Sequence, residues 1–335
     1  MTATERMCTA IKRGTPDRIP TFEWFIDPGV GKALTGSSDA MDIVERLDID
    51  GINIRPDYTK KFLDDKTFED EWGNRRQLTG DCIAAVIAQP MTDITQHQHF
   101  TFPDTKADHR FETLRKAVER FGDSRSIIWN LRDGFSDLRD LLGYEEALMA
   151  PLLEPEATRE FLDRVVDFNL ALAGEAVRRF GIKIIATTDD VAMNAGPLFS
   201  DDCYREVIYP SFRKVIQGYK ALGCLTVKHC DGDVRPLVDL WIEAGIDCLD
   251  PIDPGAGLTM RDMKTKYGDR IALKGNIDCV KTLCTGTPEE VKAEVRQAIA
   301  DAGPSGLILS SSNTIHRGVK PENYRAMLDE LRRAS

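Results

Sequence analysis

Several common signatures are missing from this sequence of 335 residues. It contains no run of about 18 consecutive apolar residues, so no helix is predicted to cross a membrane. The N-terminal stretch MTATERMCTAIKRGTPDR lacks the apolar segment that a signal peptide needs. These absences predict a cytoplasmic protein without a membrane partner.

The eight cysteines do not form a recognisable framework. None belongs to a CxxC pair and their spacing is irregular, which argues against a zinc ribbon, a thioredoxin-type site and a secreted disulfide scaffold. Most are predicted to be small buried residues in a reducing compartment. The phosphate-binding patterns GxGxxG and GxxxxGK[ST] are also absent, so a nucleotide cofactor is not supported.

The charge balance excludes another class of partner. The chain carries 44 basic and 55 acidic residues, a formal net charge of −11. Such a chain repels nucleic acid and anionic membranes unless it carries a local basic patch. The densest basic cluster is LRRAS at the end, where it is typical of a helix C-terminus. We therefore expect no nucleic-acid partner.

Short apolar runs alternate with helical segments along the second half of the chain. This order predicts parallel βαβ units. Five strands are predicted there and three upstream, at 51–57, 82–88, 126–133, 182–190, 224–232, 248–255, 271–278 and 306–313. Eight such strands predict an α/β protein with a (β/α)8 TIM barrel. We expect residues 1–335 to form one domain, with the polar stretch 58–110 decorating one rim as an elaborated N-terminal region.

Acidic side chains gather at the predicted C-terminal ends of these strands, where barrels carry their active sites. The polar residues at these ends include Asp57, Arg132, Asp133, Asp189, Asp190, His229, Asp231, Asp250, Asp253, Asp278 and Asn313. Helix capping is the alternative role for several of them. Asp189 and Asp190, however, precede their next helix by ten residues and cannot cap it. Because like charges repel, we expect a metal, an arginine such as Arg132, or a substrate beside this pair.

His229 and Asp231 are two residues apart at one strand end, so their side chains point to the same side. Cys230, between them, points to the other side. His229 and Asp231 could therefore share a ligand, although core packing is the alternative for a single histidine. Zinc usually takes three protein ligands. The third ligand stays open among Asn313, Asp190, Asp57 and Glu71.

Longer motifs connect the chain to a known family. They include AIKRGTPDRIP (10–20), TTDDVAMNAGPLFSDDCYREVIYP (187–210), HCDGDVRPLVDLWIEAGIDCLDPIDP (229–254), GDRIALKGNID (268–278) and PENYRAM (321–327). In this order they resemble the uroporphyrinogen decarboxylase family over nearly the whole chain. The resemblance implies a (β/α)8 barrel with its site at the C-terminal face, and either decarboxylation or corrinoid-dependent methyl transfer.

The decarboxylase branch carries an arginine-rich segment, of the form RQAGRY, that grips the carboxylates of a tetrapyrrole. The corresponding segment here, FEWFIDPGVGK (22–32), has no arginine. Asp57 stands where the resemblance places the catalytic acid of a decarboxylase. A decarboxylase acting on a carboxylated substrate is therefore our alternative interpretation.

The methyltransferase branch binds zinc through an H-x-C motif and a later cysteine. His229 is kept here, whereas Asp231 and Asn313 stand in the places of the two cysteines. The resemblance thus implies a zinc site formed by His229, Asp231 and Asn313. Oxygen ligands leave a metal harder than thiolates do, which favours activation of an oxygen leaving group.

These observations lead to a functional hypothesis. The chain is expected to move a methyl group from a small O-methyl donor, such as a methoxylated aromatic, to cob(I)alamin. No D-x-H-x-x-G corrinoid-binding segment is present, so the corrinoid would belong to a separate partner protein. A homodimer of the chain itself is left open.

Further residues are assigned to this hypothesis. Asp189, Asp190 or Asp57 would act as the acid that assists the departing oxygen. The residues expected to contact the substrate are Trp24, Phe25, Trp129 and Arg132. Plain core packing is the alternative for the three aromatic side chains.

Overall fold

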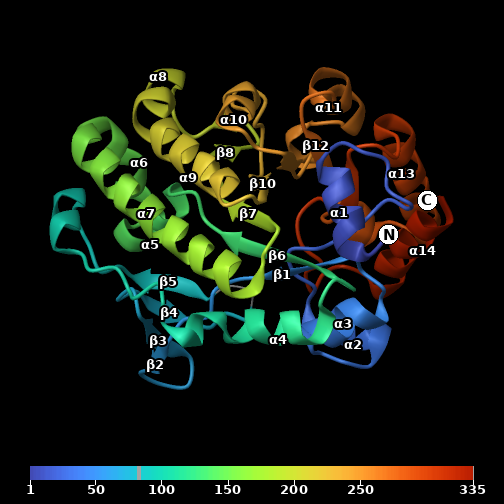
Figure 1. Cartoon of the computed structure of the whole chain (residues 1–335), viewed down its shortest axis with the longest axis horizontal. Helices are drawn as coiled ribbons and strands as arrows, with labels where there is room; N and C mark the ends of the chain where they lie inside the picture. Colours follow the sequence, from blue (N-terminus) through green and yellow to red (C-terminus); the bar gives the residue numbers. More distant parts are fainter. Residues whose placement is uncertain (81–83, 335) are drawn as a thin grey trace.

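The computed structural model describes residues 1–80 and 84–334. Its centre is a curled sheet of seven parallel strands in the order β1-β6-β7-β10-β11-β12-β13 (Figure 1). These strands are β1 (Gly51–Ile54), β6 (Ser126–Leu131), β7 (Ile184–Thr188), β10 (Leu225–His229), β11 (Cys248–Asp250), β12 (Ala272–Ile277) and β13 (Leu307–Ser311). The predicted α/β barrel architecture is confirmed.

The gap between β13 and β1 is filled by the extended segment 20–27 rather than by a regular strand. The carbonyl of Pro20 accepts a hydrogen bond from Leu309 N in β13 at 3.0 Å, and that of Thr21 accepts one from Gly51 N in β1 at 3.1 Å. Farther along, Ile26 pairs in parallel with Ile315. Segment 20–27 therefore completes the ring of strands.

The prediction of a barrel strand at 82–88 is wrong. Residues 85–88 form β5 (Ala85–Ala88) in a separate antiparallel sheet with β2 (Lys60–Phe62), β3 (Thr67–Asp70) and β4 (Arg75–Gln77). Residues 82 and 83 lie outside the described part of the chain. Along β5, exposed and half-buried side chains alternate, as in a sheet with one face in solvent. The segment contains only apolar residues, so its sequence hides this alternation.

Helices surround the parallel sheet, and the antiparallel sheet lies beside it (Figure 1). The α-helices are α1 (Ala3–Ile11), α2 (Pro28–Thr35), α3 (Ala40–Arg46), α4 (Glu112–Phe121), α5 (Phe135–Leu142), α6 (Tyr144–Leu153), α7 (Pro155–Phe180), α8 (Asp201–Cys203), α9 (Tyr209–Ala221), α10 (Val238–Ala244), α11 (Met260–Tyr267), α12 (Thr282–Thr285), α13 (Pro288–Ala302) and α14 (Pro321–Ala334). Shorter elements are η1 (Ile94–His99), η2 (Asp108–Phe111), η3 (Tyr204–Ile208) and η4 (Pro254–Ala256), with a small hairpin of β8 (Ala192–Met193) and β9 (Gly196–Pro197).

The main core lies between the parallel strands and their helices. Large side chains such as Trp129, Trp241 and Tyr219 are fully buried there. The seven cysteines in the described part are all free, and Cys82 lies outside it. Across residues 1–80 and 84–334, no helix combines the length and apolar character required to traverse a bilayer.

Candidate functional site

A buried network at the C-terminal end of β10 holds the imidazole of His229. Its Nδ1 lies 2.5 Å from Oδ2 of Asp250, the neighbouring position on β11. The indole of Trp24 donates to the same oxygen at 2.6 Å, and Nζ of Lys274 donates to the other oxygen at 2.7 Å. Because a carboxylate only accepts hydrogen bonds, Asp250 holds the proton on Nδ1. In the neutral ring, Nε2 then carries the lone pair.

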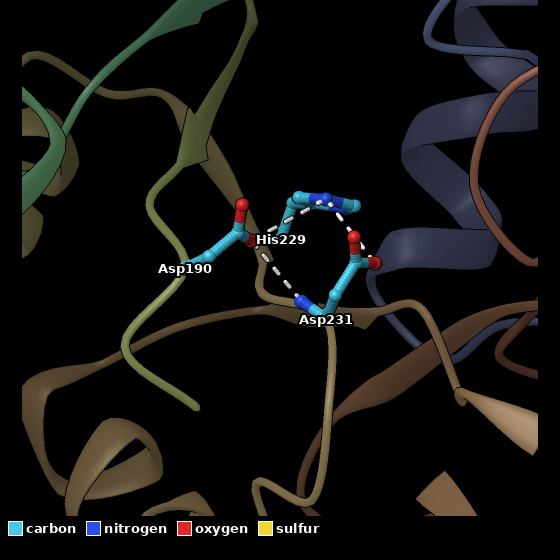
Figure 2. A group of neighbouring side chains, drawn as sticks. All are labelled: Asp190, His229 and Asp231. Carbon is cyan, nitrogen blue, oxygen red and sulfur yellow. Dashed lines mark hydrogen bonds and ion pairs between the residues drawn. The ribbon is translucent and has the colours of Figure 1, made fainter. Parts of the chain in front are cut away.

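The free nitrogen of His229 faces two carboxylates (Figure 2). Its Nε2 is 3.8 Å from Oδ1 of Asp190 and 3.6 Å from Oδ1 of Asp231. One donor atom from each of these three residues lies within 4.8 Å of the others. The side chains of Asp190 and Asp231 remain 43% and 37% exposed, so this group of three residues is open to solvent on one side.

Two further hydrogen bonds hold the carboxylates in place. The backbone nitrogen of Asp231 donates to Oδ1 of Asp190 at 3.2 Å. The side-chain nitrogen of Asn313, in the loop after β13, donates to Oδ2 of Asp231 at 2.5 Å. The structure places Asn313 next to Asp231, but the side-chain nitrogen of Asn313 donates to that carboxylate, so Asp190 rather than Asn313 completes the group with His229 and Asp231.

Side chains alternate between two sides at the strand ends, so only some residues can join the group of Asp190, His229 and Asp231. Cys230, between His229 and Asp231, is fully buried on the opposite side, as predicted. Burial raises the pKa of the Cys230 thiol far above its usual range, so this thiol stays protonated. Cys230 therefore cannot join the group without a rearrangement of the strand end.

The same alternation separates the two adjacent aspartates. Asp190 faces His229, but Asp189 is fully buried and accepts a hydrogen bond from Ser136 N at 2.5 Å. Asp189 thus caps α5, a helix that follows β6 rather than its own strand. This position keeps Asp189 away from any substrate at the mouth, contrary to the expectation that it could serve as the acid.

The electrostatics of the group favour a cation. Burial lowers the pKa of His229, but the carboxylates of Asp231, Asp250 and Asp190 outweigh burial and raise it overall. Burial also raises the pKa of Asp231 to about 6, and the nearby charge of Asp190 adds to this effect. Carboxylates held this close repel each other unless a proton or a metal ion lies between them.

The donor atoms fit a zinc ion. An imidazole nitrogen and two carboxylate oxygens are common zinc ligands, and three protein ligands are typical of a catalytic site. Tetrahedral bonds of roughly 2.0–2.2 Å place ligand atoms roughly 3.3–3.6 Å apart. The distances of 3.6 and 3.8 Å are close to this range. Asp250 supplies the carboxylate that usually accepts the other N–H of a metal-bound histidine.

A pocket of about 360 Å³ reaches the end of β7, but Asp190, His229 and Asp231 do not line it. Thr188, which pairs with His229 across β7 and β10, lies in its wall. Its other walls come from the segment after β1, the end of β6, Arg110, helices α5 and α7, and the antiparallel sheet. Trp72 and Phe168 meet edge to face in this wall, with ring centres 4.7 Å apart. Described residues of the stretch 58–110, such as Trp72 and Arg76, therefore line one side of the pocket.

Asp57 and Arg132 line the pocket but are occupied by neighbours. Both oxygens of Asp57 accept hydrogen bonds from Thr113, at 2.8 Å from N and 2.7 Å from Oγ1. The guanidinium of Arg132 lies 3.0 Å from Asp140. Glu71, another residue considered for the third ligand, pairs with Arg110 at 2.6 Å.

The predicted aromatic residues fall into three different environments. Trp129 is fully buried and stacks on Phe111 behind the sheet, so it does not line the pocket. The rings of Trp24 and His229 meet edge to face with their centres 5.2 Å apart, and the Trp24 indole donates a hydrogen bond to Asp250. Phe25 is half-buried, and its carbonyl accepts a hydrogen bond from Ile315 N at 2.9 Å. The aromatic wall of the pocket instead comes from Trp72 and Phe168.

Residues 79–334 match the family model described as uroporphyrinogen decarboxylase (URO-D). The chain belongs to the URO-D family. A methylated-thiol--coenzyme M methyltransferase of Methanosarcina mazei is 26% identical over 237 residues, which cover 69% of this chain and 61% of that protein. The chain thus spans less than two thirds of the length of this relative.

Relatives of the URO-D family carry two kinds of name. A uroporphyrinogen decarboxylase of Thioalkalivibrio sulfidiphilus is 32% identical over 271 residues, covering 73% of this chain and 71% of that protein. A solved methyltransferase from Methanosarcina mazei superposes with a TM-score of 0.80 at 19% identity, over 100% of this chain and 99% of that one. The solved structure supports the fold alone. The choice between decarboxylation and methyl transfer therefore depends on the residues at the mouth.

Sequence reasoning missed the support that holds His229 in this URO-D barrel. Asp250 was noticed as a strand-end acid, but its contact with His229 comes from the register of β10 and β11. Lys274 is fully buried within the otherwise apolar run IALKG. A buried lysine requires an anionic partner, so this residue was a usable signal. Asn130 and Asn74, which line the pocket, were not singled out either.

Replacing Asn313 with Ala is expected to lower the zinc affinity of the protein by about 10-fold, because residues that orient a metal ligand typically contribute 10–100-fold. Asn313 is half-buried, so we expect the variant to fold normally. Competition with a zinc chelator measures this affinity. An unchanged affinity would show that the Asn313 hydrogen bond does not position Asp231. A loss as large as that from removing His229 would make Asn313 a ligand.

Proposed function

We propose that the chain transfers a methyl group from an O-methyl compound to cob(I)alamin of a separate corrinoid protein, using zinc held by Asp190, His229 and Asp231. The observation that carries this proposal is the position of Nε2 of His229, which Asp250 directs toward two partly exposed carboxylates. The similarity to a methylated-thiol--coenzyme M methyltransferase supports methyl transfer as the reaction class.

The donor set favours oxygen over sulfur as the departing atom. The group contains one imidazole nitrogen and two carboxylate oxygens, and Cys230 points away from it. Without thiolate donation, a metal at this position stays hard and prefers oxygen. A zinc ion here would supply Lewis acidity toward a departing oxygen.

In the proposed reaction, the bond between the methyl carbon and its oxygen breaks as a bond to cobalt forms. The electron pair of the broken bond stays on the oxygen, which takes up a proton from solvent at the open side of the group and leaves as an alcohol or phenol. Cob(I)alamin supplies the electron pair of the new bond. The exposed sides of Asp190 and Asp231 leave the approach open to a large acceptor.

The size of the pocket supports a small donor. A cavity of about 150 Å³ holds one benzene ring. The pocket of about 360 Å³ therefore has room for one substituted ring. Segment 22–32 also contains no arginine for the carboxylates of a tetrapyrrole. Its Trp24 instead donates to Asp250.

Decarboxylation of a carboxylated substrate is the second candidate. It is supported by the uroporphyrinogen decarboxylase relative at 32% identity, a higher identity than the 26% of the methyltransferase relative. The pocket-lining acid Asp57 supports this candidate less well, because Thr113 occupies both of its oxygens.

One set of assays separates the two candidates. The purified chain is analysed for bound zinc and incubated with chemically reduced cobalamin and 2-methoxyphenol, 1,2-dimethoxybenzene or methanol. Methylcobalamin, followed by its visible absorption, is expected with zinc present and is lost after chelation. Decarboxylation of uroporphyrinogen by a metal-free chain, with no methylcobalamin from any of these donors, would overturn the proposal.

A further inference from the structure

Asp190 lies just beyond the end of β7, and two buried side chains at the end of β10 hold the chain on either side of it. Nζ of Lys228 donates a hydrogen bond to the carbonyl oxygen of Asp189 at 2.8 Å. The sulfur of Cys230 accepts a hydrogen bond from the backbone nitrogen of Val191 at 3.4 Å. The first contact holds the peptide group before Asp190, and the second holds the peptide group after it.

The two holding residues alternate along the chain with two members of the candidate metal group. Lys228 and Cys230 are 1% and 0% exposed and point to the side opposite His229 and Asp231. On the side of the metal group, the backbone nitrogen of Asp231 donates to Oδ1 of Asp190 at 3.2 Å (Figure 2). One short segment therefore holds Asp190 from both sides, with its peptide groups on one side and its carboxylate on the other.

Lys228 has a fixed position of its own. Its Nζ lies 2.7 Å from Oδ2 of Asp133, which follows β6 and has a side chain that is only 4% exposed. The same nitrogen lies 5.3 Å from the ring centre of Trp241, a distance typical of a cation–π contact. Because Asp133 already balances the charge of Lys228, the hydrogen bond to the Asp189 carbonyl adds a link between β6, β10 and the chain beyond β7.

Such a link matters for Asp190 because its side chain is 43% exposed, so burial does little to hold the carboxylate in place. A peptide group is planar, and holding the peptide groups on both sides of a residue restricts both of its backbone angles. A ligand that is ordered before the metal binds loses less conformational entropy on binding. Contacts of this kind raise the affinity of a site without touching the metal.

We propose that Lys228 and Cys230 are positioning residues, which hold the two peptide groups of Asp190 and thereby keep its carboxylate within ligand distance of Nε2 of His229. This inference rests on the proposed function for the identity of the zinc ligands. Neither residue would touch the zinc ion, because both side chains point away from the metal group.

The zinc affinity of the whole chain, measured by chelator competition, tests this inference. Lys228→Met is expected to lower the affinity by about 10-fold, within the range of residues that orient a metal ligand. Cys230→Ala is expected to lower it by about 3-fold, because it removes a single hydrogen bond to the backbone. Wild-type affinity in both variants would overturn the inference.

Cys248→Ala is the matched control for Cys230→Ala. Cys248 is equally buried, but it lies on β11, where its thiol donates to the carbonyl oxygen of Leu249 at 3.8 Å. The control is expected to keep the zinc affinity of the wild type. Equal losses from Cys230→Ala and Cys248→Ala would show that the removal of any buried thiol loosens the site, which would overturn the role of Cys230.

The same substitutions in an Asp190→Ala chain separate positioning from a general loss of structure, and calorimetry extends the measurement to this weaker site. If Lys228 and Cys230 act through Asp190, their substitution causes no further loss of affinity in that chain. A loosened strand end would also displace His229 and Asp231 and would lower the affinity by the same factor in both chains, which would overturn the inference. If Lys228→Met fails to fold, Cys230→Ala alone completes this comparison.

The methyl-transfer assay on the same variants separates this inference from the proposed function. Losses of zinc affinity that depend on Asp190, without methylcobalamin from any donor, would support the positioning role and overturn methyl transfer. Zinc-dependent methyl transfer by a chain whose Lys228 and Cys230 variants bind zinc as the wild type does would support the reaction and overturn the positioning role.

Discussion

Replacing His229 with Ala is expected to reduce the zinc affinity of the chain by more than about 100-fold, beyond the range typical of residues that only orient a ligand. His229 contributes the single nitrogen of the group, and only its Nε2 faces both Asp190 and Asp231. The two remaining carboxylates are partly exposed and would hold a zinc ion weakly. Metal analysis after dialysis, together with chelator competition, measures the loss.

His316 provides the matched control for this substitution. It lies in the loop after β13, where its Nδ1 accepts a hydrogen bond from Gly318 N at 3.1 Å and its Nε2 lies 3.2 Å from the carbonyl oxygen of Cys279. His316→Ala is therefore expected to keep zinc affinity unchanged. If both variants retained the wild-type zinc content, or lost it equally, the assignment of the metal to His229 would be wrong.

The regular part of the barrel was predictable because its signal is local. Each predicted strand from 182 to 313 is a short apolar run next to a helical segment, and the structure places a parallel strand in every one of these runs. The closure of the ring was not predictable in this way. Segment 20–27 is held by hydrogen bonds to β13, nearly 300 residues later in the chain, and it lacks the regular pairing of a strand.

The same difference between local patterns and contacts of distant segments applies to the candidate site. Side chains alternate along a strand with a period of two. This period predicts that His229 and Asp231 point to the same side and that Cys230 is buried on the other. The contact of Asp189 with Ser136 depends instead on where α5 begins relative to β7, a relation between distant segments. Asp190 was one open alternative for the third ligand, and only the fold brings its carboxylate beside Nε2 of His229.

The buried pair of Lys274 and Asp250 gives the strongest test of what holds the mouth together. Lys274→Met is expected to lower the free energy of unfolding by about 3–5 kcal/mol, because it leaves the buried charge of Asp250 without its main counter-ion. Both side chains of the pair are 0% exposed, and their atoms lie 2.7 Å apart. Methionine has a similar length to lysine, so the loss reports mainly the charge rather than a cavity.

Lys220 and Asp247 form the matched comparison, because their charged atoms are also 2.7 Å apart but their side chains are 40% and 17% exposed. Lys220→Met should cost less than about 1 kcal/mol, since solvent weakens an exposed ion pair. Urea unfolding of the two variants measures both changes. The double variant Lys274→Met with Asp250→Asn should recover part of the loss, because it removes the unpaired charge. Similar losses for Lys274→Met and Lys220→Met would contradict this account, because distance rather than burial would then set the strength of the pair.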